Sequence, residues 1–146
     1  MRVALVGGGV MGEAILAAAL ERGVLAADNV TVAEISAPRR EQLAHVYSVS
    51  VTADSSQAID GANLVILAVK PQDMGTLLDE IAPLVSGDQL LVSVAAGITT
   101  SFIERRVPVD VPVVRVMSNT PVLVDEAMSA ISAGSHATEE HLALAE

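Results

Sequence analysis

Three glycines near the start of the chain have the spacing G-x-G-x-x-G: Gly7, Gly9 and Gly12. They follow an apolar run at residues 2–6 and precede a helix-forming stretch at 13–20. In this order the first glycine permits a tight turn, the second lets a pyrophosphate approach the backbone, and the third allows close helix–strand packing. Because the N–H groups and dipole of a helix start favour anions, the motif predicts a dinucleotide-binding loop. The alternative is a glycine-rich turn without a ligand.

The residues after the second predicted strand give conflicting signals about the ribose of that dinucleotide. Glu34 lies 22 positions after Gly12, where a carboxylate accepts hydrogen bonds from the ribose hydroxyls of NAD and repels a 2′-phosphate. Ser36, Arg39 and Arg40 follow, and they could bind that phosphate by charge-assisted hydrogen bonds. The two arginines are equally compatible with ordinary solvated helix positions. The predicted cofactor is therefore NADP or NAD, with a slight preference for NADP tolerance.

Lys70 is the only lysine of the chain and comes directly after the apolar run 63–69. Since ligands of open α/β sheets bind at the carboxyl ends of the strands, we interpret Lys70 as a cation beside the ligand. Pro71 would fix the loop before the next helix. The alternative for Lys70 is a surface lysine at a strand end.

Two further strand ends could approach the same ligand. Small residues at 95–97 would let a flat ring lie against the backbone, although they would also serve close helix–sheet packing. The turn at 118–121 is rich in polar donors, and Asn119 and Thr120 become candidates through their location. A turn of this composition is otherwise ordinary.

Composition excludes several classes of function. The chain has 51% hydrophobic residues, one Phe, one Tyr, no Trp and a net charge of −10, which disfavours nucleic-acid binding. It has no cysteine, and its three histidines do not cluster, so thiol catalysis and metal binding are not expected. No apolar run reaches the length of a membrane span and no signal peptide is readable, so a cytoplasmic protein is the default expectation.

Short apolar runs alternate with amphipathic segments, which predicts an α/β fold with a doubly wound, Rossmann-like parallel sheet. Asp54 and Thr99 are predicted N-caps. Right-handed crossovers would place the first strand beside the fourth. The segment 127–133 alternates weakly and is a candidate for an added edge strand. Six parallel strands are expected at about 2–6, 30–34, 49–52, 63–69, 89–95 and 112–117, with helices at about 11–22, 38–46, 54–60, 72–84 and 99–106.

Residues 1–146 are expected to form one NAD(P)-binding domain. Thr138 resembles the start of a helix, yet the chain stops at Glu146, two turns later. Because so short a helix is marginal alone, more protein is expected beyond this point.

Taken together, four segments resemble the amino-terminal domain of the pyrroline-5-carboxylate reductase family. They are VGGGVMG at 6–12, LAVKPQ at 67–72, SVAAGIT at 93–99 and VRVMSNTP at 114–121. The resemblance implies NAD(P)H-dependent reduction of 1-pyrroline-5-carboxylate to L-proline, the last step of proline biosynthesis, with hydride passing from the nicotinamide to the imine carbon. Two positions depart from the family pattern: Ser118 stands where proline is frequent, and Glu34 is less expected where a 2′-phosphate must fit.

The resemblance also implies roles for particular residues. Gly9, Val10 and Met11 would meet the pyrophosphate, while Ser36 and Arg39 would lie near the adenosine ribose. The cofactor cleft would be lined by Ala68, Val69, Lys70 and Pro71. The nicotinamide would approach Ala95, Ala96 and Gly97, with Asn119 and Thr120 at the reacting end.

No catalytic residue is identified within the chain. Members of the family continue into a helical domain that forms a dimer and supplies a substrate loop and a possible proton donor to the imine. We therefore expect this chain alone to bind dinucleotide weakly or moderately and to turn over poorly. The alternatives are the NAD(P) domain of another dehydrogenase, of the β-hydroxyacid or deazaflavin-dependent type, and a non-catalytic NAD(P)-sensing module. A reading frame that truly ends at Glu146 would favour the sensor.

Overall fold

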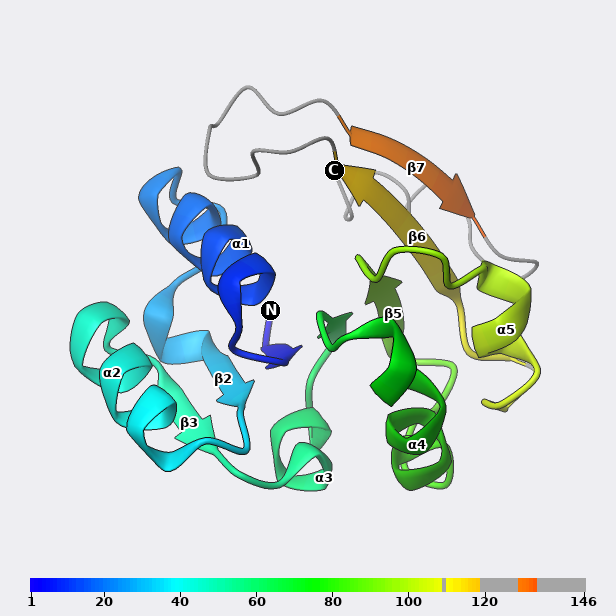
Figure 1. The fold of residues 1–146 in the computed structure, drawn as a ribbon, viewed down its shortest axis with the longest axis horizontal. Coiled ribbons are helices and arrows are strands. Elements are labelled where there is room, and N and C mark those ends of the chain that lie inside the picture. Colours follow the sequence, from blue (N-terminus) through cyan, green and yellow to red (C-terminus); the bar gives the residue numbers. More distant parts are fainter. Residues whose placement is uncertain (109, 119–128, 134–146) are drawn as a thin grey trace.

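The protein is built around one seven-stranded sheet with the strand order β3-β2-β1-β4-β5-β6-β7 (Figure 1). A computed structural model describes residues 1–108, 110–118 and 129–133. The strands are β1 Val3–Val6, β2 Val30–Ala33, β3 Ser50–Thr52, β4 Leu64–Leu67, β5 Leu90–Ser93, β6 Val113–Ser118 and β7 Ser129–Ala133. The helices are α1 Val10–Glu21, η1 Ala27–Asn29, α2 Ala37–Tyr47, α3 Ser55–Ile59, α4 Pro71–Ile81 and α5 Thr100–Glu104.

The predicted topology is confirmed. Strands β1 to β6 are all parallel, and β1 lies between β2 and β4, with Val6 opposite both Ala33 and Leu67. The order of the strands therefore reverses at β1 and β4, which makes this the switch point of the sheet. The candidate edge strand is also confirmed, since β7 pairs with β6 in the antiparallel sense.

Helices cover both faces of the sheet, and this burial explains the unbroken apolar runs of the strands (Figure 1). In β1, Val3 and Leu5 pack in one cluster with Leu16 of α1 and Leu43 of α2. The alternate residues of β1 face a second cluster formed by α3, α4 and α5. Each fully buried Leu, Ile or Val side chain contributes roughly 1.5–3 kcal/mol to folding, so the two clusters dominate the stability of the domain.

The helix ends follow local chemistry. The predicted caps are confirmed: Asp54 accepts a hydrogen bond from the N–H of Ser56 at 2.9 Å, and Thr99 accepts one from Phe102 at 3.1 Å. The helix predicted over 72–84 is too long, because α4 ends at Ile81. Pro83 cannot donate a backbone hydrogen bond and interrupts the helix there. In the described part of the chain, no helix is long and apolar enough to cross a membrane.

Candidate functional site

Four loops leave the carboxyl edge of the sheet at and beside its switch point. They follow the neighbouring strands β2, β1, β4 and β5, and they carry residues 34–36, 7–9, 68–70 and 94–97 respectively. Most of the cofactor-binding residues predicted from sequence thus lie along one edge, where an α/β sheet binds its ligands.

Backbone atoms leave no room for a side chain at Gly7, in the loop between β1 and α1, or at Gly12, in the first turn of α1. Gly7 has a φ of +104°, and a Cβ atom there would lie 2.6 Å from the carbonyl oxygen of Ala68. A Cβ on Gly12 would lie against the carbonyl oxygen of Gly7, inside the 3.0 Å that Cβ atoms keep. The tight turn and the close helix packing predicted for these glycines are confirmed.

Gly9 faces open space instead. It is exposed, and a Cβ atom built on it would meet no atom within 4 Å among the other residues that the structure describes. Gly9 is also the N-cap of α1, and no side chain caps that helix. The first backbone N–H groups of α1, which include those of Val10 and Met11, have no partner within a helix and are free for an anion.

A second uncapped helix begins beside the first. The N-cap of α4 is Lys70, whose exposed side chain makes no capping hydrogen bond, and Pro71 is the first helical residue. In contrast, side chains cap α2, α3 and α5. Among the described α-helices, the two without a side-chain cap thus start after the adjacent strands β1 and β4, at the switch point. Together with Lys70 they form a surface suited to an anionic group.

Glu34 lies just beyond β2, where its spacing predicted a ribose ligand. Both of its carboxylate oxygens already accept backbone hydrogen bonds, from the N–H of Gly8 at 3.1 Å and of Ser36 at 2.8 Å. Since each oxygen has a second lone pair, Glu34 keeps capacity to accept from a ribose hydroxyl.

Arg39 contacts the glycine loop. Its Nε donates to the carbonyl oxygen of Gly8 at 2.6 Å, and its Nη2 donates to that of Gly9 at 3.4 Å and pairs with Glu13. Only 23% of its side chain is exposed, so a solvated surface position does not describe it. The neighbouring Arg40 has different partners, since its Nη1 donates to the carbonyl oxygens of Glu34 and Ile35 at 2.8 and 3.0 Å.

Sequence reasoning missed Glu13, which pairs with Arg39, and Tyr47, which holds Glu13 in place. The Tyr47 hydroxyl, at the end of α2, donates to Glu13 in the first turn of α1 at 2.9 Å. Hydrogen bonds from Arg39 and then from Tyr47 lower the pKa of Glu13. Burial, and then the hydrogen bond to Glu13, raise the pKa of Tyr47. No sequence signal links two residues that lie 34 positions apart on different helices.

The strand end predicted to approach the nicotinamide is partly open. Ala95 is buried, whereas Ala96 and Gly97 are exposed, and a Cβ on Gly97 would meet nothing within 4 Å in the described part of the chain. Ser118 is the last residue of β6. The predicted site residues Asn119 and Thr120 lie outside the described residues.

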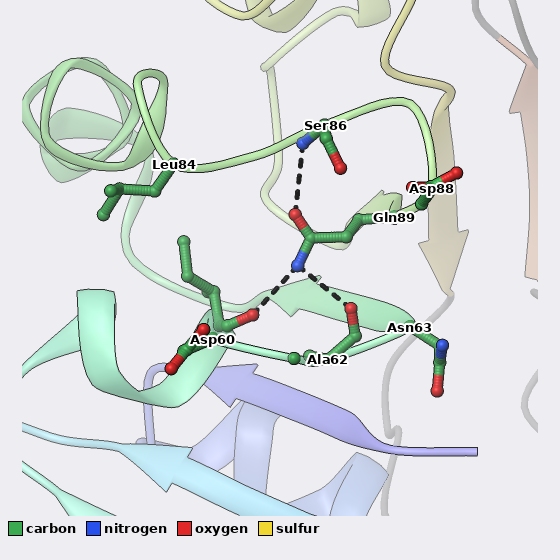
Figure 2. A pocket seen from close by; sticks show the side chains of 9 residues that line it. Asp60, Ala62, Asn63, Leu84, Ser86, Asp88 and Gln89 are labelled. Atoms are coloured by element: carbon green, nitrogen blue, oxygen red, sulfur yellow. Dashed lines mark hydrogen bonds between the residues drawn. The ribbon is translucent and has the colours of Figure 1, made fainter.

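A hollow of about 280 Å³ lies at the opposite, amino edge of the sheet (Figure 2). Its centre is the buried amide of Gln89, which donates to the carbonyl oxygens of Ile59 and Ala62 at 2.9 Å each and accepts from the N–H of Ser86 at 3.2 Å. These contacts satisfy three backbone groups and join two turns, so we interpret Gln89 as structural. Within the described ranges, no cluster of three or more His, Cys, Asp or Glu could hold a metal ion.

Known proteins resemble the chain along its whole length. It is 37% identical to the pyrroline-5-carboxylate reductase of Mycobacterium tuberculosis (strain CDC 1551 / Oshkosh), over 97% of this chain and 49% of that protein. The Methanosarcina acetivorans protein of the same name is 30% identical, over 97% of this chain and 52% of its own length. The chain therefore spans about half the length of the curated relatives it matches.

The comparison of structures agrees. A pyrroline-5-carboxylate reductase from Coxiella burnetii superposes with a TM-score of 0.93 at 26% identity, covering 99% of this chain and 54% of that one. Residues 2–97 match the model of a protein family described as NADP oxidoreductase, coenzyme F420-dependent. The chain belongs to this NADP oxidoreductase family.

Proposed function

We propose that this chain is the dinucleotide-binding part of a pyrroline-5-carboxylate reductase. In this proposal the complete protein reduces 1-pyrroline-5-carboxylate to L-proline with NADPH or NADH, as the last step of proline biosynthesis. The observation that carries the proposal is the pair of uncapped helix starts at the switch point, on a chain 37% identical to a reductase of that name over 97% of its length.

The residues present fit a dinucleotide. A Cβ atom on Gly9 would meet no atom of the other described residues within 4 Å, so these residues leave room for a pyrophosphate to reach the N–H groups at the start of α1. The net charge of −10 would repel an anion over most of the surface, and the helix starts and Lys70 supply local compensation. The nicotinamide, when bound, would supply the hydride that reduces the C=N bond.

The chain's own residues would bind and orient the cofactor. Gly9, Val10 and Met11 would hold the pyrophosphate, and Glu34 and Ser36 the adenosine ribose. Val69 to Pro71 would line the middle of the cleft. Beyond β5, the exposed backbone of Ala96 and Gly97 would let the flat nicotinamide ring lie against it, and Asn119 and Thr120 would stand at the reacting end.

The rest of the active site would come from a helical part, absent from these 146 residues. It would bind the substrate, donate the proton to the imine nitrogen and form a homo-oligomer. A cytoplasmic location belongs to the same proposal. Because hydride transfer needs both reactants held in one closed site, the chain alone should bind dinucleotide and produce little proline.

Two measurements test this proposal. Calorimetry on the chain should show binding of NADH or NADPH, and no binding would contradict a dinucleotide site. The protein made from the whole reading frame that contains the chain should then oxidise NAD(P)H only when 1-pyrroline-5-carboxylate is present, with one proline formed per cofactor. Binding without such turnover would favour a sensing module.

The family description also names coenzyme F420, and this coenzyme defines the competing dehydrogenase function. Reduction of F420 by NADPH, with no activity on 1-pyrroline-5-carboxylate, would replace the proposed reaction and leave the dinucleotide site in place.

A further inference from the structure

Side chains from the β2–α2 region hold three consecutive peptide groups of the glycine loop. The N–H of Gly8 donates to Glu34 at 3.1 Å. The carbonyl oxygen of Gly8 accepts from Arg39 Nε at 2.6 Å, and that of Gly9 accepts from Arg39 Nη2 at 3.4 Å. The same Gly9 oxygen accepts the first hydrogen bond of α1, from the N–H of Glu13 at 2.9 Å.

These contacts determine where the loop's N–H groups point. In a planar trans peptide the carbonyl and the following N–H point in opposite directions. With the carbonyls of Gly8 and Gly9 directed at Arg39, the N–H groups of Gly9 and Val10 are directed away from it. A donor on one side of a peptide also polarises it, which strengthens the N–H on the other side as a donor.

Arg39 has little capacity left for another ligand. A guanidinium carries five N–H donors, and four are engaged here, by the carbonyls of Gly8 and Gly9, by Glu13, and by the side chain of Gln42 at 2.9 Å. Glu13 also neutralises its charge and is itself held by Tyr47. The side chain is thus held between α1, α2 and the loop.

We propose that Arg39 is a positioning residue that presents the glycine loop to the pyrophosphate, and that it therefore serves NADH and NADPH equally. This role differs from recognition of the 2′-phosphate, for which Arg39 has a single N–H donor left while it keeps its contacts with the loop, Gln42 and Glu13. The inference rests on the proposed dinucleotide site, because it assigns the work done there by one side chain.

The test uses two variants that remove the same charge. Arg39→Met keeps the aliphatic stem and removes the donors to the loop. Arg40→Met is the matched control, because Arg40 contacts the carbonyls of Glu34 and Ile35 and not the loop. Calorimetric titrations with NADH, NADPH and 2′-AMP, at one ionic strength, separate pyrophosphate from 2′-phosphate recognition, and circular dichroism confirms that both variants are folded.

Arg39→Met should weaken the binding of NADH and of NADPH by the same factor, about tenfold or ~1.4 kcal/mol. The affinity for 2′-AMP should stay unchanged. Amide NMR should show the N–H signals of Gly9 and Val10 moving in this variant and not in Arg40→Met. If Arg39→Met does not fold, Glu13→Gln should be used instead. It should lower the affinities for NADH and NADPH by equal factors, smaller than those expected for Arg39→Met. A loss of affinity confined to NADPH and 2′-AMP, or no loss of affinity for any of the three ligands, would overturn the inference. Wild-type protein that binds none of the three ligands would contradict the proposed function instead.

Discussion

Replacement of Gly12 by alanine should destabilise the protein even though alanine is the better helix former. Gly12 lies in the first turn of α1, and a Cβ atom there would overlap the carbonyl oxygen of Gly7. The loop cannot retreat, because the Cα of Gly7 already faces the carbonyl oxygen of Ala68, which lies 2.6 Å from where a Cβ would stand. The helix start or the end of β4 must therefore shift.

The magnitude follows from two opposing effects. Alanine in place of glycine favours a helix by about 1 kcal/mol, whereas overpacking a well-packed site costs roughly 1–3 kcal/mol and sometimes more. Since the obstacle at Gly12 is backbone held from behind, we take the upper end and expect a net loss of about 2 kcal/mol. For a chain of 146 residues that corresponds to a fall of about 4–8 °C in Tm.

Gly9→Ala is the matched control, because a Cβ at Gly9 meets none of the described atoms within 4 Å and its φ of −77° suits alanine. The loss of a tolerated N-cap, up to about 1 kcal/mol, is offset by the lower entropy of the unfolded chain, about 0.4–1 kcal/mol. Its Tm should stay close to that of the wild type, while its affinity for NADH falls about tenfold or more, because the methyl group occupies the proposed pyrophosphate position.

Thermal unfolding followed by circular dichroism, together with calorimetric titration of NADH, measures both variants. A Gly12→Ala protein as stable as the wild type would refute the argument from packing. A Gly9→Ala protein that binds NADH with unchanged affinity would refute the placement of the pyrophosphate.

Three further outcomes are expected. Tyr47 is the only tyrosine, so phenolate absorbance reports its pKa alone. That pKa should lie above 10.0 in the folded protein and closer to 10.0 in Glu13→Gln. The same titration midpoint in both proteins would rule out an effect of Glu13 on the pKa of Tyr47. The lowered pKa of Glu13 makes its stabilising contribution present above pH 4.5 and lost as the pH falls further, so urea unfolding should show the wild type and Glu13→Gln converging in stability in acid. Gln89→Leu leaves the buried carbonyls of Ile59 and Ala62 without their donor and should cost about 2–4 kcal/mol in urea unfolding, with NADH affinity unchanged.

The strands could be predicted from sequence because strands buried on both faces are unbroken runs of apolar residues. Both faces of β4 are covered, so all of Leu64–Leu67 is apolar, and such a run flanked by glycine, lysine and proline is hard to mistake. The caps at Asp54 and Thr99 were equally readable, since a capping side chain acts within three residues of itself. Pro83 marks the end of α4 in the same way, because a proline disfavours continuation of the helix even where the amphipathic pattern continues.

The partners of Arg39 and Arg40 could not be predicted, because they depend on the direction in which each side chain leaves α2. Adjacent residues of a helix point about 100° apart, so one arginine faces the glycine loop and the other faces the end of β2. Which one does so depends on where α2 begins and on how it packs through Leu43. Residue type and spacing are the same for both arginines and carry no such information.

Arg39 joins α2 to the glycine loop, and this link bears on the preference between NADH and NADPH. If Arg39 positions the pyrophosphate loop, substituting it cannot alter the preference between NADH and NADPH without weakening both. Arg40 is then the better position for changing that preference, because its Nη1 donates to the carbonyls of Glu34 and Ile35, at the end of β2 where the ribose is expected. The acid that opposes a 2′-phosphate, Glu34, also holds the N–H of Gly8. Glu34→Gln, which removes the negative charge but loses one of the two accepting oxygens, should therefore improve NADPH binding relative to NADH while lowering affinity for both.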